Sequence, residues 1–170
     1  MHGYKCFNSD MTNLYGNKFE VGKKYSIRGE LKIGTRGNGF HICENLEDTL
    51  KYFGAFNEDI VICEVIGTGE ILSDWDDYYG FEKLAVSELE IVKILSRDEI
   101  IQMALSFGED RVFRFIQLFK LTEEEIKLFE EKYSKYMRIL MAIEYYQKGN
   151  KDVYKLDSFF EIEHLRRRHK

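Results

Sequence analysis

The 170-residue sequence predicts an α+β fold, in which a twisted, mainly antiparallel β-sheet unit with one short helix (1–95) packs against a helical region (96–170). Two observations lead to this prediction. Eleven of the 13 glycines lie in residues 1–80, where short runs of β-forming residues alternate with turn residues. From residue 96 onward, apolar residues instead recur with a period near 3.6. Because no Pro- or Ser-rich linker separates the two parts, we expect them to form one compact unit.

Five runs in the first part are rich in β-branched and aromatic residues and are bounded by turn residues. They predict strands at 4–8, 25–33, 40–43, 60–66 and 85–95. The glycines between these runs are typical of turns, because glycine adopts positive φ values without a steric penalty. One short helix is expected after Asn45, whose side chain suits an N-cap, and it should end before Gly54.

Helix starts in the second part are marked by capping boxes, in which a Ser or Thr is followed three residues later by Glu. The three pairs are Ser96 with Glu99, Thr122 with Glu125, and Ser158 with Glu161. The spacing of apolar residues predicts helices at 98–107 and 110–120 and a long helix at 123–148, which Gly149 should end.

The charge is unevenly distributed. Residues 1–95 contain 10 Lys or Arg against 16 Asp or Glu, a net charge of −6, whereas residues 96–170 carry +1. This balance argues against direct nucleic-acid binding by a basic surface. No apolar run is long enough for a membrane span or a signal peptide, so we expect a soluble cytoplasmic protein without membrane contact. The three widely spaced cysteines are expected to be free thiols in a reducing compartment.

Several segments of the first part resemble an uncharacterised domain that is common in phages and Clostridia-type genomes. They read GYKCFNSDMT (3–12), FEVGKKY (19–25), GFHICEN (39–45) and KLAVSELEI (83–91), with CEV and GxGEI between the last two. The resemblance covers about residues 3–95 and implies a phage or mobile-element origin. It carries over no activity, and it does not extend into residues 96–170.

The run from Gly39 to Ile42 and the helical segment after it also resemble ADP-ribosyltransferases. This family has a split β-sandwich with a cleft for NAD. The resemblance implies that Lys5, His41 and either Glu88 or Glu90 would face the NAD, with His41 positioning the nicotinamide ribose and a glutamate orienting the reacting centre. Read without the resemblance, Glu88 and Glu90 alternate with apolar residues and are typical of a solvent-facing strand surface.

His41 is also a candidate by itself, because it is the only histidine away from the chain ends. It could act as a general base, or complete a zinc site with Cys6, Cys43 and Cys63. The alternative is a core histidine surrounded by thiols packed as small apolar groups. The absence of a Cys-x-x-Cys pair favours the second interpretation, and we expect no metal.

The most concentrated surface feature is a run of acids and aromatics in an expected loop before Gly80. It consists of Asp74, Trp75, Asp76, Asp77, Tyr78 and Tyr79. Interface centres are enriched in Trp and Tyr, so this run is a candidate partner-binding surface with negative charge. The alternative is a loop whose aromatics cover the core. The basic tail from Arg166 to Lys170 is typical of a solvated chain end, although it could also contact nucleic acid.

These features favour a non-enzymatic phage or mobile-element accessory protein that binds and inhibits a host factor. The partner would be a protein or a protein–nucleic-acid complex, for instance a defence complex such as a CRISPR effector, in which carboxylates of residues 74–79 replace phosphates in a basic channel. No cofactor is expected. One alternative is an ADP-ribosyltransferase-like enzyme that uses NAD. Another is a self-associating structural domain, a homodimer formed through Met137, Leu140 and Met141.

Overall fold

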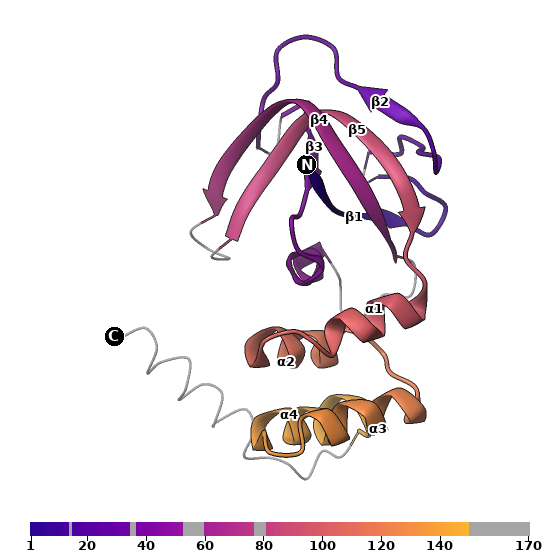
Figure 1. The fold of residues 1–170 in the computed structure, drawn as a ribbon, viewed down its shortest axis with the longest axis vertical. Helices are drawn as coiled ribbons and strands as arrows, with labels where there is room; N and C mark the ends of the chain where they lie inside the picture. Colours follow the sequence, from indigo (N-terminus) through magenta and orange to yellow (C-terminus); the bar gives the residue numbers. More distant parts are fainter. Residues whose placement is uncertain (14, 35–36, 53–59, 77–80, 150–170) are drawn as a thin grey trace. The chain divides into compact units, whose positions relative to one another are not determined.

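The computed structural model describes residues 1–149 of the chain, except residues 14, 35–36, 53–59 and 77–80. An antiparallel β-sheet and a series of helices make up these residues, which confirms the predicted α+β class (Figure 1). The chain divides into two compact units, Met1–Met103 and Ala104–Lys170. Among the described helices, none combines the length and the apolar character needed to cross a membrane.

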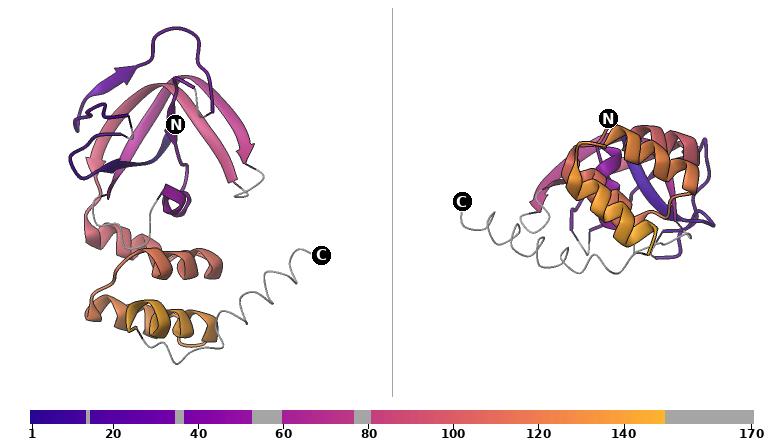
Figure 2. Two further views of the ribbon diagram at one scale, coloured as in Figure 1. Left: turned by 180° about the vertical axis from the view of Figure 1, so that it is seen from behind. Right: turned by 90° about the horizontal axis from the view of Figure 1, so that it is seen from below.

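The first unit is built on a five-stranded sheet in the order β1, β4, β5, β2, with β3 also paired to β5. The long central strands are β4 (Ile60–Asp76) and β5 (Phe81–Ile94). β1 (His2–Asn8) runs antiparallel to the first half of β4. The short strands β2 (Lys24–Ser26) and β3 (Phe40–Ile42) pair with different parts of β5. Figure 2 shows the sheet from behind, with β4 and β5 curved along their length.

β4 continues to Asp76, well past the strand end predicted at residue 66. The prediction stopped there because two glycines follow, and glycine is typical of turns. In the structure the strand register shifts between Thr68 and Ile71, and Gly69 adopts a φ of +76° within this irregularity. The glycine therefore serves a β-bulge, which bends a strand without ending it.

The strand predicted at 25–33 is also wrong for most of its length, because β2 ends at Ser26 and the last backbone bond to β5 after it, among the described residues, is the 3.0 Å bond from the Ile27 amide to the Ser87 carbonyl. The side chain of Asn38 explains the difference. Its Oδ1 accepts a 2.9 Å hydrogen bond from the Lys32 amide, and its Nδ2 donates a 3.0 Å bond to the Glu30 carbonyl. These bonds satisfy backbone groups that a strand would pair with its neighbour, so the segment folds as a loop.

An apolar cluster forms the core of the sheet unit. Its buried members are Phe7, Phe19, Ile42, Cys63, Val65, Leu84, Val86, Leu89 and Ile91. The ring centroid of Phe19 lies 4.9 Å from that of Phe7 and 4.8 Å from that of Tyr25, which joins the loop before β2 to β1. The short helix predicted after Asn45 is present as a 3₁₀ helix, η1 (Leu46–Tyr52), with Leu46 and Leu50 buried.

Two of the predicted capping boxes are confirmed. At the start of α1 (Arg97–Ala104), the Glu99 carboxylate accepts a 2.8 Å hydrogen bond from the Ser96 amide, and the Ser96 hydroxyl accepts one from the Glu99 amide. Thr122 and Glu125 make the same reciprocal pair before α3 (Glu123–Lys132). The third box, at Ser158, lies outside the described residues.

The described part of the second unit contains α2 (Glu109–Leu118), α3, α4 (Met137–Ala142) and a π-helical turn, η2 (Ile143–Gln147). Aromatic packing joins them: the ring of Phe115 stacks on Phe119 and on Phe129 of α3. The side chain of Gln147 adds hydrogen bonds to the connection between α2 and α3, since it accepts from the Leu121 amide and donates to the Phe119 carbonyl.

The single helix predicted at 123–148 is wrong, because α3 ends at Lys132 and α4 begins at Met137. Tyr133 caps α3, and its hydroxyl lies 3.0 Å from the Leu105 carbonyl and 3.1 Å from the Phe107 carbonyl. These tertiary hydrogen bonds stabilise the end of α3 at a point where the spacing of apolar residues alone predicts that the helix continues. The break also leaves Met137, which the sequence pattern assigned to the apolar stripe, 69% exposed.

Candidate functional site

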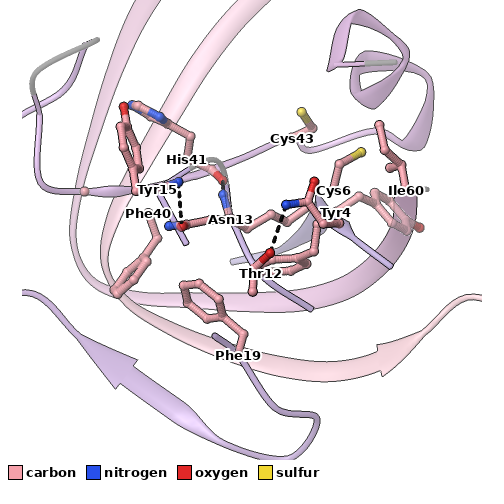
Figure 3. Close-up of a pocket in the computed structure, with 14 residues that line it drawn as sticks. Tyr4, Cys6, Thr12, Asn13, Tyr15, Phe19, Phe40, His41, Cys43 and Ile60 are labelled. Carbon is pink, nitrogen blue, oxygen red and sulfur yellow. Dashed lines mark hydrogen bonds between the residues drawn. The ribbon is translucent and has the colours of Figure 1, made fainter. Parts of the chain in front are cut away.

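A pocket of about 220 Å³ opens in the first unit where β1, β3 and the loop between β1 and β2 come together (Figure 3). β1 approaches the end of β3 closely, since Tyr4 and Cys43 exchange two backbone hydrogen bonds of 2.7 and 2.8 Å. Gly3 makes this approach feasible: a Cβ atom at this position would lie 2.6 Å from the Cys43 carbonyl oxygen. The close approach of β1 to β3 that forms the pocket therefore requires glycine at position 3. No sequence signal indicates this requirement, because Gly3 simply precedes the first predicted strand.

The loop after β1 forms one wall of the pocket and is held by its own side chains. The Asn8 amide donates to the Thr12 hydroxyl at 2.9 Å. The Oδ1 of Asn13 accepts hydrogen bonds from the backbone amides of Tyr15 and Asn17, at 3.0 and 2.9 Å. Such side-chain-to-backbone bonds stabilise a tight loop and fix the orientation of the side chains on it. Thr12 and Asn13 therefore present fixed polar groups to the pocket (Figure 3).

Lys5 is the charged residue of the pocket. Its Nζ donates a 2.7 Å hydrogen bond to the main-chain carbonyl of His41 and lies 5.6 Å from the ring centroid of Phe7. Burial lowers the pKa of the Lys5 ammonium from its ordinary value of 10.5, because the charged form loses its hydration. Among the described residues that line the pocket there is no Asp or Glu. A desolvated positive charge thus belongs to a pocket whose described lining contains no carboxylate.

His41 also lines the pocket, from the middle of β3 opposite Ala85. The residue is half-buried, and its Nε2 atom is shielded from solvent. Its contact with Lys5 is made by the main-chain oxygen, so the imidazole takes no part in that bond. The structure therefore places Lys5 and His41 at the same pocket, and their contact with NAD stays a prediction.

The two glutamates implied by that resemblance lie elsewhere on β5. The Glu88 carboxylate accepts a 2.8 Å hydrogen bond from the Thr68 hydroxyl on β4. Glu90 forms an ion pair with Lys24 of β2 at 3.2 Å, with the lysine side chain largely exposed. Neither glutamate is among the residues that line the pocket. The described residues therefore contain no site that unites His41 with either carboxylate.

The three cysteines are free thiols. Cys6 and Cys43 line the pocket, whereas Cys63 is fully buried in the core next to Met11. Burial raises the pKa of Cys6 to about 12 and that of Cys63 to about 11, so both stay protonated at neutral pH. In the part of the chain that the structure describes, no three His, Cys, Asp or Glu side chains are arranged to hold a metal ion.

The acidic and aromatic run is placed only in part. Asp74, Trp75 and Asp76 are the last residues of β4 and pair through their backbones with residues 81–83 of β5. The predicted loop is therefore wrong for these three residues. Asp77, Tyr78 and Tyr79 lie outside the described residues, and so does the basic tail from Arg166 to Lys170.

The sequence pointed to Lys5 only through the resemblance to ADP-ribosyltransferases, although a signal in the residues themselves was present. Side chains alternate between the two faces of a strand, so Lys5 shares a face with Phe7, the large apolar residue two positions along. A lysine on the apolar face of a strand is a buried-charge candidate. The loop residues Thr12 and Asn13 gave no comparable signal, because their position depends on how the loop folds against β1.

Comparison with family models matches residues 1–103 to one described as "Domain of unknown function (DUF7666)". The matched range coincides with the first compact unit and includes every residue that lines the pocket. Comparisons with curated proteins and with solved structures found no match.

Proposed function

The chain belongs to the DUF7666 family through residues 1–103, and from this premise we propose that the family domain is a small-molecule-binding module whose ligand site is the pocket beside β1 and β3. The observation that carries the proposal is the composition of this pocket. Aromatic rings of Phe7, Phe19 and Phe40 line it together with the polar side chains of Thr12 and Asn13. An apolar cavity with a few fixed polar groups is the usual form of a ligand site.

The construction of the walls also supports binding rather than simple packing. The rings of Phe7 and Phe19 belong to the buried core, so one side of the pocket is rigid. Another part of the wall is the start of the loop after β1, which is held by hydrogen bonds of Asn8, Thr12 and Asn13. A preformed cavity of this kind needs little reorganisation when a ligand enters, which reduces the entropic cost of binding.

A fragment screen on the full chain by ligand-observed NMR tests the proposal. We expect at least one fragment to bind and to lose its signal in Phe40→Ala, which removes an aromatic wall of the pocket. Val61→Ala is the matched control, because Val61 packs against the same core cluster but does not line the pocket. If no fragment binds, or if Phe40→Ala binds all fragments as well as Val61→Ala does, the proposal is wrong.

We also propose a second function, in which the β4–β5 hairpin of a phage or mobile-element accessory protein binds and inhibits a host factor in the cytoplasm. Two observations favour it. The backbone pairing of residues 74–76 with residues 81–83 concentrates acidic and aromatic residues at the end of the hairpin. Residues 1–95 also carry the net charge of −6, which suits a partner with a basic surface.

Affinity capture from a bacterial host lysate, followed by mass analysis, tests this second function. The wild-type chain should retain a basic protein that the double variant Trp75→Ala/Tyr79→Ala fails to retain. Val21→Ala is the control, because Val21 is an apolar residue 48% exposed in the same unit, outside both the hairpin and the pocket. Retention of the same protein by the double variant would overturn the proposed surface.

A further inference from the structure

We propose that the pocket beside β1 and β3 takes a small organic anion, a carboxylate with a flat apolar body, whose charge is bound by Lys5. This inference rests on the proposed ligand-binding function and names the class of ligand. It is carried by three features of the pocket: an ammonium group on a residue that lines it, a described lining that contains no Asp or Glu, and a limited size with aromatic rings in the wall.

The hydrogen bonding of Lys5 leaves room for a ligand. A lysine ammonium has three N–H donors. Among the described residues, the acceptor for Lys5 Nζ is the carbonyl oxygen of His41, at 2.7 Å. Since a neutral carbonyl uses one donor and supplies no formal charge, the ammonium retains donors for an anionic group placed in the cavity.

The charge balance of the pocket favours an anion over a neutral ligand. The described lining residues include Lys5 and no Asp or Glu, so the positive charge has no counter-charge in the wall. A buried charge without a partner is unfavourable, and its desolvation disfavours the charged form, as the lowered pKa of Lys5 indicates. A carboxylate that entered the pocket would supply the missing counter-charge and form charge-assisted hydrogen bonds.

A second donor group lies on the loop wall. Both hydrogen bonds that fix the Asn13 side chain are accepted by its Oδ1, from the amides of Tyr15 and Asn17. Its Nδ2 group is consequently the part of the amide that remains to donate, and Asn13 lines the pocket (Figure 3). Lys5 on β1 and Asn13 on the loop after it thus supply donor groups from two elements that line the pocket, and a carboxylate has two oxygens that can accept from them.

The size of the cavity limits the rest of the ligand. Its volume of about 220 Å³ is below the roughly 300–1,000 Å³ of sites for drug-sized molecules. Rings of Phe7, Phe19 and Phe40 form the apolar part of the wall and suit a flat apolar or aromatic body. A monocyclic aromatic carboxylate therefore matches the site in charge, size and surface.

The experiment compares three probes of nearly equal shape, benzoate, benzamide and benzylamine, by calorimetric or NMR titration of the full chain at neutral pH. Benzoate should bind at least tenfold more tightly than benzamide, and benzylamine should bind most weakly. In Lys5→Met, which keeps the length of the side chain and removes the charge, the preference for benzoate over benzamide should disappear.

Two further variants separate the role of the charge from the integrity of the fold. Asn13→Asp keeps an oxygen acceptor for the amides of Tyr15 and Asn17 while it adds a negative charge to the wall. The affinity for benzoate should therefore fall tenfold or more, and the affinity for benzamide should not change. Lys24→Met removes a positive charge from β2 outside the pocket and should leave all three affinities unchanged. The amide NMR spectrum of each variant checks that it is folded.

The outcomes distinguish the inference from the proposed function. If benzamide binds as tightly as benzoate, or if Lys5→Met and Asn13→Asp bind benzoate as the wild type does, the anion class is wrong while small-molecule binding stands. If benzoate does not bind but neutral fragments do, the anion class is likewise wrong. If the fragment screen finds no ligand of any kind, both the inference and the proposed function fail.

Discussion

The Nζ of Lys5 donates a 2.7 Å hydrogen bond to the main-chain oxygen of His41 and so links β1 to β3 across 36 residues of sequence. Any residue at position 41 would supply the same carbonyl acceptor. The position of the pocket charge therefore depends on the strand pairing around Cys43 and not on the imidazole. The sequence by itself indicated His41 as a candidate site residue, whereas in the structure His41 contributes its main-chain carbonyl and Lys5 contributes the charge.

Replacing Lys5 by Met is expected to change how stability depends on pH. The pKa of Lys5 in the folded chain is below 10.5, its ordinary value, because burial disfavours the ammonium. Between these two values the unfolded chain binds more protons, so the contribution of Lys5 to the free energy of unfolding rises with pH. The wild type should therefore gain stability relative to Lys5→Met between neutral pH and pH 10.5. Urea unfolding of both proteins at matched pH measures this gain, and a constant difference would contradict it.

The thiols should be unreactive until the protein unfolds. Cys63 is fully buried, and burial raises the pKa of Cys6 to about 12 and that of Cys63 to about 11, from 9.0. Because the thiolate is the reacting form, a disulfide reagent at slightly alkaline pH should modify both residues slowly in the native protein and rapidly in denaturant. Mass analysis of the labelled peptides gives the rate at each cysteine. Rapid native labelling of Cys63 would show that the core is open.

Gly3→Ala is expected to destabilise the first unit and to distort the pocket. The added Cβ would lie 2.6 Å from the carbonyl oxygen of Cys43, a backbone atom that cannot rotate away. β1 would have to move, which weakens the two hydrogen bonds between Tyr4 and Cys43. We expect a loss of about 1–3 kcal/mol in the free energy of unfolding, the usual range for overpacking. Denaturant unfolding measures it, and a variant as stable as the wild type would mean that the close approach is absent in solution.

Tyr133→Phe tests the tertiary cause of the break between α3 and α4. The substitution removes the hydroxyl that lies 3.0 Å from the Leu105 carbonyl and 3.1 Å from the Phe107 carbonyl, and it keeps the ring stacked on Phe129. The free energy of unfolding should fall by about 1 kcal/mol, the typical contribution of one hydrogen bond. Leu128→Ala, at an exposed position of α3, serves as a control with a smaller expected loss. An unchanged stability in Tyr133→Phe would show that these bonds do not hold the break.

Sequence reasoning was most successful where the decisive contacts are local. The boxes at Ser96 and Thr122 join groups three residues apart, so their hydrogen bonds form once the first helical turn exists. Strands β1 and β3 lie within one or two residues of the predicted ranges for the same reason: their β-forming residues are bounded by turn signals. Sequence reasoning failed where a residue typical of turns has another role in the tertiary structure. Gly69 is such a residue, because it bends β4 instead of ending it.

The sequence by itself determined the α+β class, the helix starts and the uneven charge, because composition, periodicity and capping act within a few residues. Only the tertiary structure decided the length of β4, the end of α3 at Tyr133 and the pocket around Lys5. Each of these depends on groups far apart in the chain. The length of β4 depends on its bulged pairing with β5, the end of α3 on the two carbonyls before α2 that face the Tyr133 hydroxyl, and the position of Lys5 on a carbonyl of β3. The stabilising free energy of these contacts is gained only when the distant segments pack together, and a local sequence pattern carries no information on that packing.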